Sequence, residues 1–149
     1  MKTSYLIFLL AICFQGTVSA NCPDLSGNYT AALSESDVEL QITQVGCEKA
    51  DAIYDEYFFN YRSEKQFIFD GTFHITFESD TIVISEKHQW VNTVLHYEEQ
   101  YRFKRDGKVM RTLGRMYLNK TNDLVEEKDI YQENDELYGK QTIYYNRKK

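Results

Sequence analysis

The chain has 149 residues and a formal net charge of −6 at pH 7, from 17 Lys and Arg against 23 Asp and Glu. This acidic balance argues against nucleic acid and anionic membrane surfaces as electrostatic partners. With one proline and dispersed glycines, the sequence shows no linker, low-complexity run or internal repeat.

Residues 1–20 are predicted to be a cleavable signal peptide. Lys2 supplies a positive charge, Tyr5 to Phe14 is an apolar run, and Val18-Ser19-Ala20 has the small-x-small pattern of a cleavage site. A transmembrane helix needs about 20 apolar residues, so we expect no stable membrane insertion, although an uncleaved anchor is the alternative. We therefore expect a secreted or periplasmic protein, with residues 21–149 as one domain. Loss of Lys2 would leave 16 basic and 23 acidic residues and a net charge of −7.

Two cysteines remain after the predicted cleavage, because Cys13 leaves with the leader. An even pair in an oxidising compartment predicts a disulfide between Cys22 and Cys47, which would stabilise the fold by about 3 kcal/mol. It would tie the new N-terminus to the end of the second strand. The alternative is two separate buried thiols, since two cysteines without nearby histidines make an incomplete zinc site.

Apolar residues recur with a period of two along the mature chain, which is typical of half-buried strands. The residues that share one parity are Val38, Leu40 and Ile42; Ile53, Tyr57, Phe59 and Tyr61; Phe67, Phe69, Phe73, Ile75 and Phe77; Leu95, Tyr97, Tyr101 and Phe103; and Leu137, Ile143 and Tyr145. Strand orientation stays open in 81–90 and 123–131, and a weak helical pattern covers 48–56.

Turn residues separate these runs at Ser79-Asp80, Asp106-Gly107, 121–123 and 133–135, as hairpins require. Gly71 and Gly114 interrupt alternating patterns, and we interpret them as bulges or bends that curve a sheet instead of loop ends. The sequence therefore predicts an all-β fold, an antiparallel meander of about eight to ten strands closed into a lipocalin-like barrel. A two-sheet β-sandwich is the alternative.

The start of the mature chain has the spacing C-x-x-L-x-G-x-Y, with Gly27 two residues before Tyr29 on the first strand. This start resembles that of the calycin superfamily, which includes the lipocalins and avidins. The resemblance implies a barrel whose interior holds a small apolar molecule. Lipocalins prefer tryptophan where Tyr29 stands, and their downstream arginine and acidic turn are not placed here. Trp90 is the sole tryptophan, so the avidin biotin pocket is not implied. The chain also resembles small exported bacterial β proteins of unassigned role.

Catalytic motifs do not occur: there is no G-x-S-x-G elbow, H-E-x-x-H helix, P-loop or dinucleotide fingerprint. Adjacent carboxylates such as Glu98 and Glu99 would point to opposite faces of a strand. We therefore predict a protein that is not an enzyme and needs no cofactor, with a hydrolase as the least favoured class.

Two histidines and two glutamates surround one predicted hairpin. If Val91-Asn92-Thr93 is its turn, Glu86 would oppose Glu98 and His88 would oppose His96 on one face, where they could bind zinc or copper. A turn one residue shorter would break this register. Solvent-exposed side chains are the ordinary explanation, and we assign no metal site.

Two carboxylates, Asp55 and Glu99, lie on apolar parities and would point into a barrel, where Arg111 or Arg115 could pair with Glu99. The residues predicted to bind a ligand are Tyr57, Phe73, Phe77, Tyr97, Glu99, Tyr101 and Arg111. The alternative is that these charges reach water near strand ends and the aromatic side chains simply fill the core.

These patterns predict an exported, non-enzymatic β-barrel that binds a small amphipathic or apolar ligand in an aromatic-lined interior. The alternative is a secreted inhibitor or protein-interaction module with a filled core, acting through surface loops and exposed aromatics; no protein partner is indicated. The aromatics expected outside are Tyr54, Phe58, Tyr138 and Tyr144. An interior volume of about 300 Å³ or more would favour the ligand carrier. Sequons at Asn28 and Asn119 would accept sugar in a glycosylating host.

Overall fold

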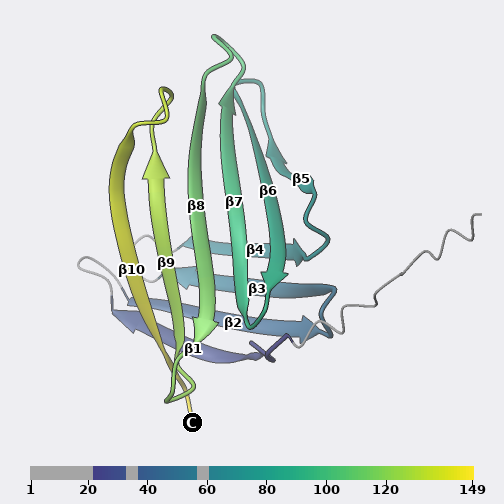
Figure 1. Cartoon of the computed structure of the whole chain (residues 1–149), viewed down its shortest axis with the longest axis vertical. Coiled ribbons are helices and arrows are strands. Elements are labelled where there is room, and N and C mark those ends of the chain that lie inside the picture. Colours follow the sequence, from purple (N-terminus) through teal and green to yellow (C-terminus); the bar gives the residue numbers. More distant parts are fainter. Residues whose placement is uncertain (1–21, 33–36, 57–60) are drawn as a thin grey trace, which may run out of the picture.

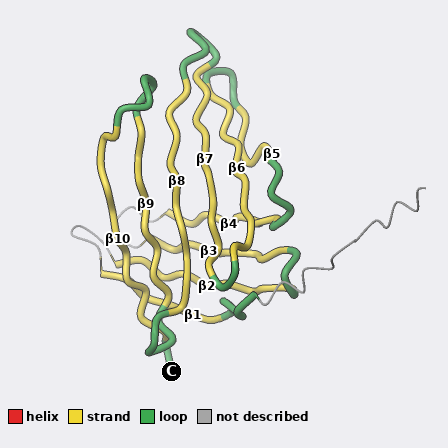
Figure 2. The backbone as a smooth tube through the Cα atoms, in the orientation of Figure 1, coloured by secondary structure: helices red, strands yellow, loops and turns green. Residues whose placement is uncertain are grey.

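The computed structural model describes residues 22–32, 37–56 and 61–149, and these form strands joined by turns, with no helix among them (Figures 1 and 2). The strands are β1 (Gly27–Ala32), β2 (Asp37–Val45), β3 (Lys49–Glu56), β4 (Tyr61–Ile68), β5 (Phe73–Glu78), β6 (Ile82–Val91), β7 (Val94–Phe103), β8 (Val109–Leu118), β9 (Leu124–Tyr131) and β10 (Leu137–Arg147).

The ten strands belong to one antiparallel sheet with the order β4-β3-β2-β1-β10-β9-β8-β7-β6-β5. Chain neighbours pair throughout this order, except that β1 pairs with β10 and that β4 and β5 stand at its two ends. The link between β1 and β10 is short, joining Tyr29 to Arg147 and Thr30 to Asn146. The predicted all-β meander is therefore confirmed as a nearly closed barrel.

The sheet folds over itself, so that β1 to β4 cross behind the long strands β6 to β10 (Figure 1). The chain passes from one half to the other after β4, where the Phe69 amide donates to the Glu48 carbonyl and the Gly71 amide to the His88 carbonyl. Buried apolar side chains from both halves meet between them. The largest that are fully buried are Tyr29, Leu25, Leu40, Leu95 and Leu124.

The predicted hairpin turns lie where the sequence places them, between β5 and β6, β7 and β8, β8 and β9, and β9 and β10. Asn122 and Asp135 adopt positive φ angles of 65° and 62° there, as short polar turn residues can. The weak helical pattern at 48–56 is overruled by pairing on both sides, because β3 lies between β2 and β4.

Of the two glycines expected at bulges or bends, Gly71 lies at a bend in the short connection between β4 and β5, at φ +73°, whereas Gly114 pairs in regular register with Tyr97 and Lys128. The register shifts occur instead on β5 between Ile75 and Phe77 and on β10 between Leu137 and Gly139.

The inward parity was predicted correctly for β2, where Val38, Leu40 and Ile42 are buried, and wrongly for β3. On β3 the core takes Ala50 and Ala52, whereas Ile53 and Asp55 line a groove on the other face together with Lys148. Ala50 and Ala52 belong to the same buried cluster as Leu95 and Met116 of the other half. The aromatic pattern of 57–61 misled the assignment, and residues 57–60 lie outside the described residues.

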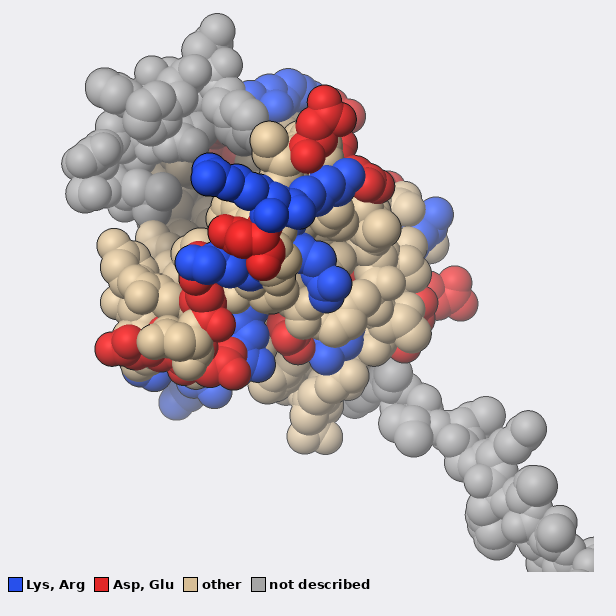
Figure 3. Space-filling view, turned by 90° about the horizontal axis from the view of Figure 1, so that it is seen from above, with Lys and Arg blue, Asp and Glu red and all other residues tan. Residues whose placement is uncertain are grey.

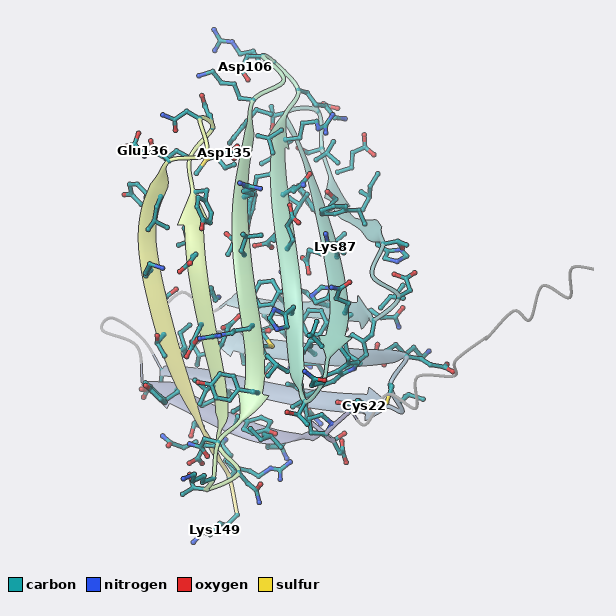
Figure 4. The ribbon with its side chains drawn as sticks, in the orientation of Figure 1. Cys22, Lys87, Asp106, Asp135, Glu136 and Lys149 are labelled. Atoms are coloured by element: carbon teal, nitrogen blue, oxygen red, sulfur yellow. A yellow bond between two sulfur atoms is a disulfide. The ribbon has the colours of Figure 1, made fainter. Side chains whose placement is uncertain are left out.

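The segment before β1 is fastened at several points. Cys22 and Cys47 form the predicted disulfide, with Cα atoms 5.7 Å apart, and Cys47 follows the end of β2 (Figure 4). The buried Tyr29 hydroxyl donates to the Leu25 carbonyl at 2.8 Å. Arg147 from β10 lies over the Tyr29 ring, 5.4 Å from its centroid, and donates to the Ser26 carbonyl. A side chain at Gly27 would collide with Arg147, since its Cβ would stand 2.9 Å from the guanidinium Nε.

Candidate functional site: a charged cavity inside the barrel

A cavity of about 400 Å³ lies between the two halves of the barrel. Its apolar and aromatic walls come from Val38, Tyr54, Phe67, Tyr97, Tyr101, Met116, Ile143 and Tyr145, and its polar walls from Ser63, Lys65, Glu86, His88, Glu99, Glu126, Lys128 and Gln141. The volume exceeds the 300 Å³ at which a ligand site becomes reasonable. The cavity differs from the fully apolar part of the core because three carboxylates and two ammonium groups line it.

Glu86 and Glu99 lie side by side because the β6–β7 hairpin has a two-residue turn. Val91 pairs with Val94, Asn92 takes a φ of 56°, and this register sets Glu86 opposite Glu99 and both toward the interior. Like charges directly opposite each other are destabilising. The pair is tolerated because a cation from the other half of the barrel lies between the two carboxylates.

That cation is Lys65 of β4. Its Nζ lies 3.0 Å from Glu86 Oε1 and 3.4 Å from Glu99 Oε1. The Glu86 side chain is 5% exposed and the Glu99 side chain 15%, whereas that of Lys65 is 36% exposed. Burial disfavours the ammonium, but the two carboxylates outweigh it and raise the pKa of Lys65.

The shifted register of β5 adds a further donor to this group. Thr76 lies at the irregularity between Ile75 and Phe77, and its hydroxyl donates to Glu86 Oε1 at 3.2 Å. A bulge turns a side chain toward a face that regular alternation would deny it. On the other glutamate, the Tyr101 hydroxyl is hydrogen-bonded to Glu99; burial and this carboxylate raise the pKa of Tyr101 well above its usual value.

The third carboxylate, Glu126 of β9, has a separate set of partners. Tyr97 donates to its Oε1 at 2.7 Å and Tyr145 to its Oε2 at 3.1 Å, while Lys128 Nζ lies 3.2 Å from Oε2. Burial, followed by the Glu126 charge, raises the pKa values of Tyr97 and Tyr145 far enough to keep both phenols protonated. Glu126 therefore has its partners within the protein itself.

His88 completes the wall and is neutral at physiological pH. Its ring packs on Phe67, 4.6 Å between centroids, and burial followed by the Lys65 charge lowers its pKa to about 4. Its Nε2 lies 3.6 Å from Glu86 Oε2, beyond hydrogen-bonding distance. The imidazole thus presents a hydrogen-bonding group to the cavity.

A groove of about 690 Å³ between β4 and β5 adjoins this cavity. The two spaces share Ser63, Lys65, Glu86, Glu99 and Tyr101. The groove lies where the sheet order ends, so the interior borders the unpaired edges of the barrel. Ile68, Ile75 and Phe77 contribute apolar surface to it.

The predicted site residues are distributed over both faces of the sheet. Tyr97, Glu99 and Tyr101 line the cavity, and Phe77 lines the groove. Phe73 is 43% exposed, with Lys87 Nζ 4.9 Å from its ring centroid, so it does not join them. Tyr57 lies outside the described residues.

Arg111 also lies away from the cavity. Its guanidinium lies over the Tyr131 ring, 5.2 Å from the centroid, and pairs with Asp135 in the β9–β10 turn at 3.0 Å. Figure 4 labels Asp135, and Figure 3 shows basic and acidic side chains intermingled at this end of the barrel. The odd-numbered residues of β8 face outward, and these include Arg111 and Arg115. Arg115 pairs there with Glu127. The cation that pairs with Glu99 is therefore Lys65, and not Arg111 or Arg115 as expected.

Asp55 was expected inside together with Glu99 and lies outside, paired with Arg62 at 3.3 Å. Of the aromatics expected outside, Tyr138 and Tyr144 are 70% and 62% exposed, as predicted. Tyr54 instead faces the cavity, and Phe58 is not described.

Sequence reasoning did not assign Lys65, Glu126 or Lys128 to the interior. Each stands in a run of polar residues, "RSEKQ" or "EEKD", where no apolar alternation marks the inward face. The Phe67 and Phe69 parity extends back to Lys65 and was a usable signal for that residue. For β9, pairing with β8 was needed to set the register.

The two histidines and two glutamates considered as metal ligands do not share one face, because the β6–β7 turn has two residues instead of three. His88 is paired with Tyr97 and Glu86 with Glu99, whereas His96 is paired with Gln89 and Glu98 with Lys87 on the opposite face. Among residues 22–32, 37–56 and 61–149, no group of three or more His, Cys, Asp or Glu side chains is arranged to hold a metal ion.

No protein-family model, curated protein or solved structure matches this chain. The part of the chain that the structure describes contains no helix long and apolar enough to cross a membrane.

Proposed function

We propose that the chain is an exported, non-enzymatic β-barrel protein that binds a small amphipathic molecule inside the barrel. The observation that carries this proposal is the cavity of about 400 Å³, which combines aromatic walls with a few oriented charges. This is the usual composition of a small-molecule site. The Cys22–Cys47 disulfide is compatible with an extracellular location.

The contact between Tyr29 and Arg147 supports the finer assignment to a calycin-like family. The lipocalin pattern combines an aromatic residue two positions after a glycine with a downstream arginine. Here Arg147, on the last strand, lies over Tyr29 on the first, and Gly27 leaves it room. The chain has no acidic-turn signature that we can place.

Binding is tested with a neutral fluorescent reporter of apolar sites, N-phenyl-1-naphthylamine, titrated against the exported protein. We expect saturable binding with one site per chain. Ser63→Trp would fill the cavity mouth and abolish binding, because Ser63 lines both the cavity and the groove. Thr142→Trp, on the exposed face of β10, is the matched control and should bind normally. Saturable binding that survives Ser63→Trp would place the reporter elsewhere and contradict the proposal.

A protein-interaction module remains the second candidate, and one observation favours it. Leu137, Tyr138 and Tyr144 on β10 are all exposed, at 44%, 70% and 62%, and aromatic residues are enriched in protein interfaces. Absence of reporter binding, together with native mass spectra that show no retained small molecule, would favour this alternative.

A further inference from the structure

The position occupied by the Lys65 ammonium indicates what kind of group the cavity accommodates. Nζ lies between two carboxylates that share it, 3.0 Å from Glu86 and 3.4 Å from Glu99. The cavity wall carries three carboxylates against two ammonium groups, and the Glu126 carboxylate is served separately by Lys128 and two tyrosines. The negative excess therefore falls on the pair Glu86 and Glu99.

The exposure of the partners decides which of them can move. Glu86 is 5% exposed and fixed on the central part of β6, while Lys65 is 36% exposed on a flexible four-carbon chain at the edge strand β4. An anionic ligand that recruited Lys65 would leave a buried carboxylate unpaired, which is strongly unfavourable. A cationic ligand would displace Lys65 toward the adjoining groove and water, and both carboxylates would keep a cation.

A second feature of the wall is independent of the carboxylates. The His88 imidazole is neutral and 6% exposed, and it makes no hydrogen bond to another residue that the structure describes. Tyr101 and Phe67 lie in the same wall and provide aromatic surface. Aromatic faces attract organic cations, and this attraction increases where water is excluded.

We propose that the molecule bound in the cavity is an organic amine with an aromatic or aliphatic body, and that its ammonium group binds between Glu86 and Glu99 in place of the Lys65 ammonium. In this arrangement Lys65 is an internal competitor that neutralises the two carboxylates until the amine binds. This inference rests on the proposed function, since it names the ligand class of the same cavity.

The test uses three indole compounds that share one ring system and differ in charge: tryptamine, the neutral alcohol tryptophol and the anion indole-3-propionate. Each competes with N-phenyl-1-naphthylamine at pH 7. We expect tryptamine to bind about tenfold more tightly than tryptophol, the value of one charge-assisted hydrogen bond, and the anion to bind most weakly.

Variants identify the residues. Lys65→Met removes the competitor and should raise tryptamine affinity about tenfold, while Lys87→Met, whose partner Glu98 lies on the outer face, should leave it unchanged. Glu99→Gln should abolish the preference for tryptamine over tryptophol, and Glu98→Gln should not. Cooperative thermal unfolding above the assay temperature, in the Met variants as well as the Gln variants, shows that each barrel is folded when its affinity is measured.

The outcomes distinguish failure of the amine inference from failure of the proposed ligand-binding function. If the reporter binds and indole-3-propionate competes best, with binding lost in Lys65→Met, the cavity binds carboxylates and the amine inference is overturned. If the reporter binds and the three compounds compete equally, the inference is overturned as well. If the reporter itself does not bind, the proposed function fails together with it.

Discussion

Gly114 offers a sharp test of the interior packing, because the Tyr97 ring lies directly against its Cα. A Cβ at position 114 would stand 2.0 Å from Tyr97 Cζ and 2.4 Å from its hydroxyl oxygen. Ordinary contacts begin near 3.4 Å, so the ring would have to leave its place. Its hydroxyl would then lose the 2.7 Å hydrogen bond to the buried Glu126 carboxylate.

We expect Gly114→Ala to lower the free energy of unfolding by about 2.5 to 6 kcal/mol. Overpacking contributes about 1 to 3 kcal/mol and a lost hydrogen bond to a buried charge about 1.5 to 3 kcal/mol. The assay is urea unfolding with the disulfide intact. Gly139→Ala is the matched control and should change stability by less than about 0.5 kcal/mol, since a Cβ there meets no atom within 4 Å.

A double-mutant cycle isolates the contact. In a Tyr97→Leu background the space beside position 114 opens, so Gly114→Ala should cost at least about 2 kcal/mol less than in the natural chain. An equal cost in both backgrounds, or a Gly114→Ala protein as stable as the unmodified one, would refute the conclusion that the Tyr97 ring packs directly on Gly114.

Three further outcomes follow from the structure. The pKa of His88, lowered from 6.5 to about 4 by burial and Lys65, means that the unfolded chain binds this proton first, so stability falls as pH drops from 6.5 to 4. His88→Phe should remove about 3 kcal/mol of that loss, seen as the difference between two pH series of urea unfolding; parallel series would contradict it. Cys22→Ser with Cys47→Ser, which opens a 25-residue separation, should cost about 3.5 kcal/mol in the same assay, and a change below 1 kcal/mol would count against it. Arg147→Met should lower stability by about 1 to 3 kcal/mol through the lost contacts with Tyr29 and Ser26, with Arg147→Lys intermediate; a loss in Arg147→Met with none in Arg147→Lys would assign the effect to charge alone.

The fold class was predictable because each hairpin carries its own local signal. Alternation on β2 and β7 and turn residues such as Asn122 and Asp135 act over a few residues, and the structure confirms them. The closure between β1 and β10 rests on two residue pairs more than 100 positions apart in sequence, and no local pattern encodes them. The expectation of closure came instead from the interrupting glycines, the consecutive hairpins and the need to protect sheet edges, and the resemblance at Gly27 and Tyr29 agreed with it.

The candidate site was predictable only where aromatic residues mark the inward face. Tyr97, Glu99 and Tyr101 share a parity with Leu95, and all three line the cavity. Arg111 was placed on the wrong face of β8. Its neighbours Met110 and Thr112 do not alternate clearly between apolar and polar, so the two-residue period could not show which set of residues faces inward. The predicted β6–β7 turn was one residue longer than the observed one. The shorter turn pairs Glu86 with Glu99 instead of Glu98, and these two neighbours point to opposite faces of the strand.

The charged wall is an expensive way to fill a barrel, and this bears on its role. Buried ion pairs seldom stabilise a protein more than apolar side chains of equal volume would. The same barrel fills the rest of its interior with Leu25, Leu40, Leu95 and Leu124, so its geometry does not require charges. Glu86 and Glu99 oppose each other in register, which costs stability unless Lys65 or another cation lies between them. A packing role alone gives no reason for two facing carboxylates around one partly exposed lysine, whereas the proposed binding of an organic cation would give one.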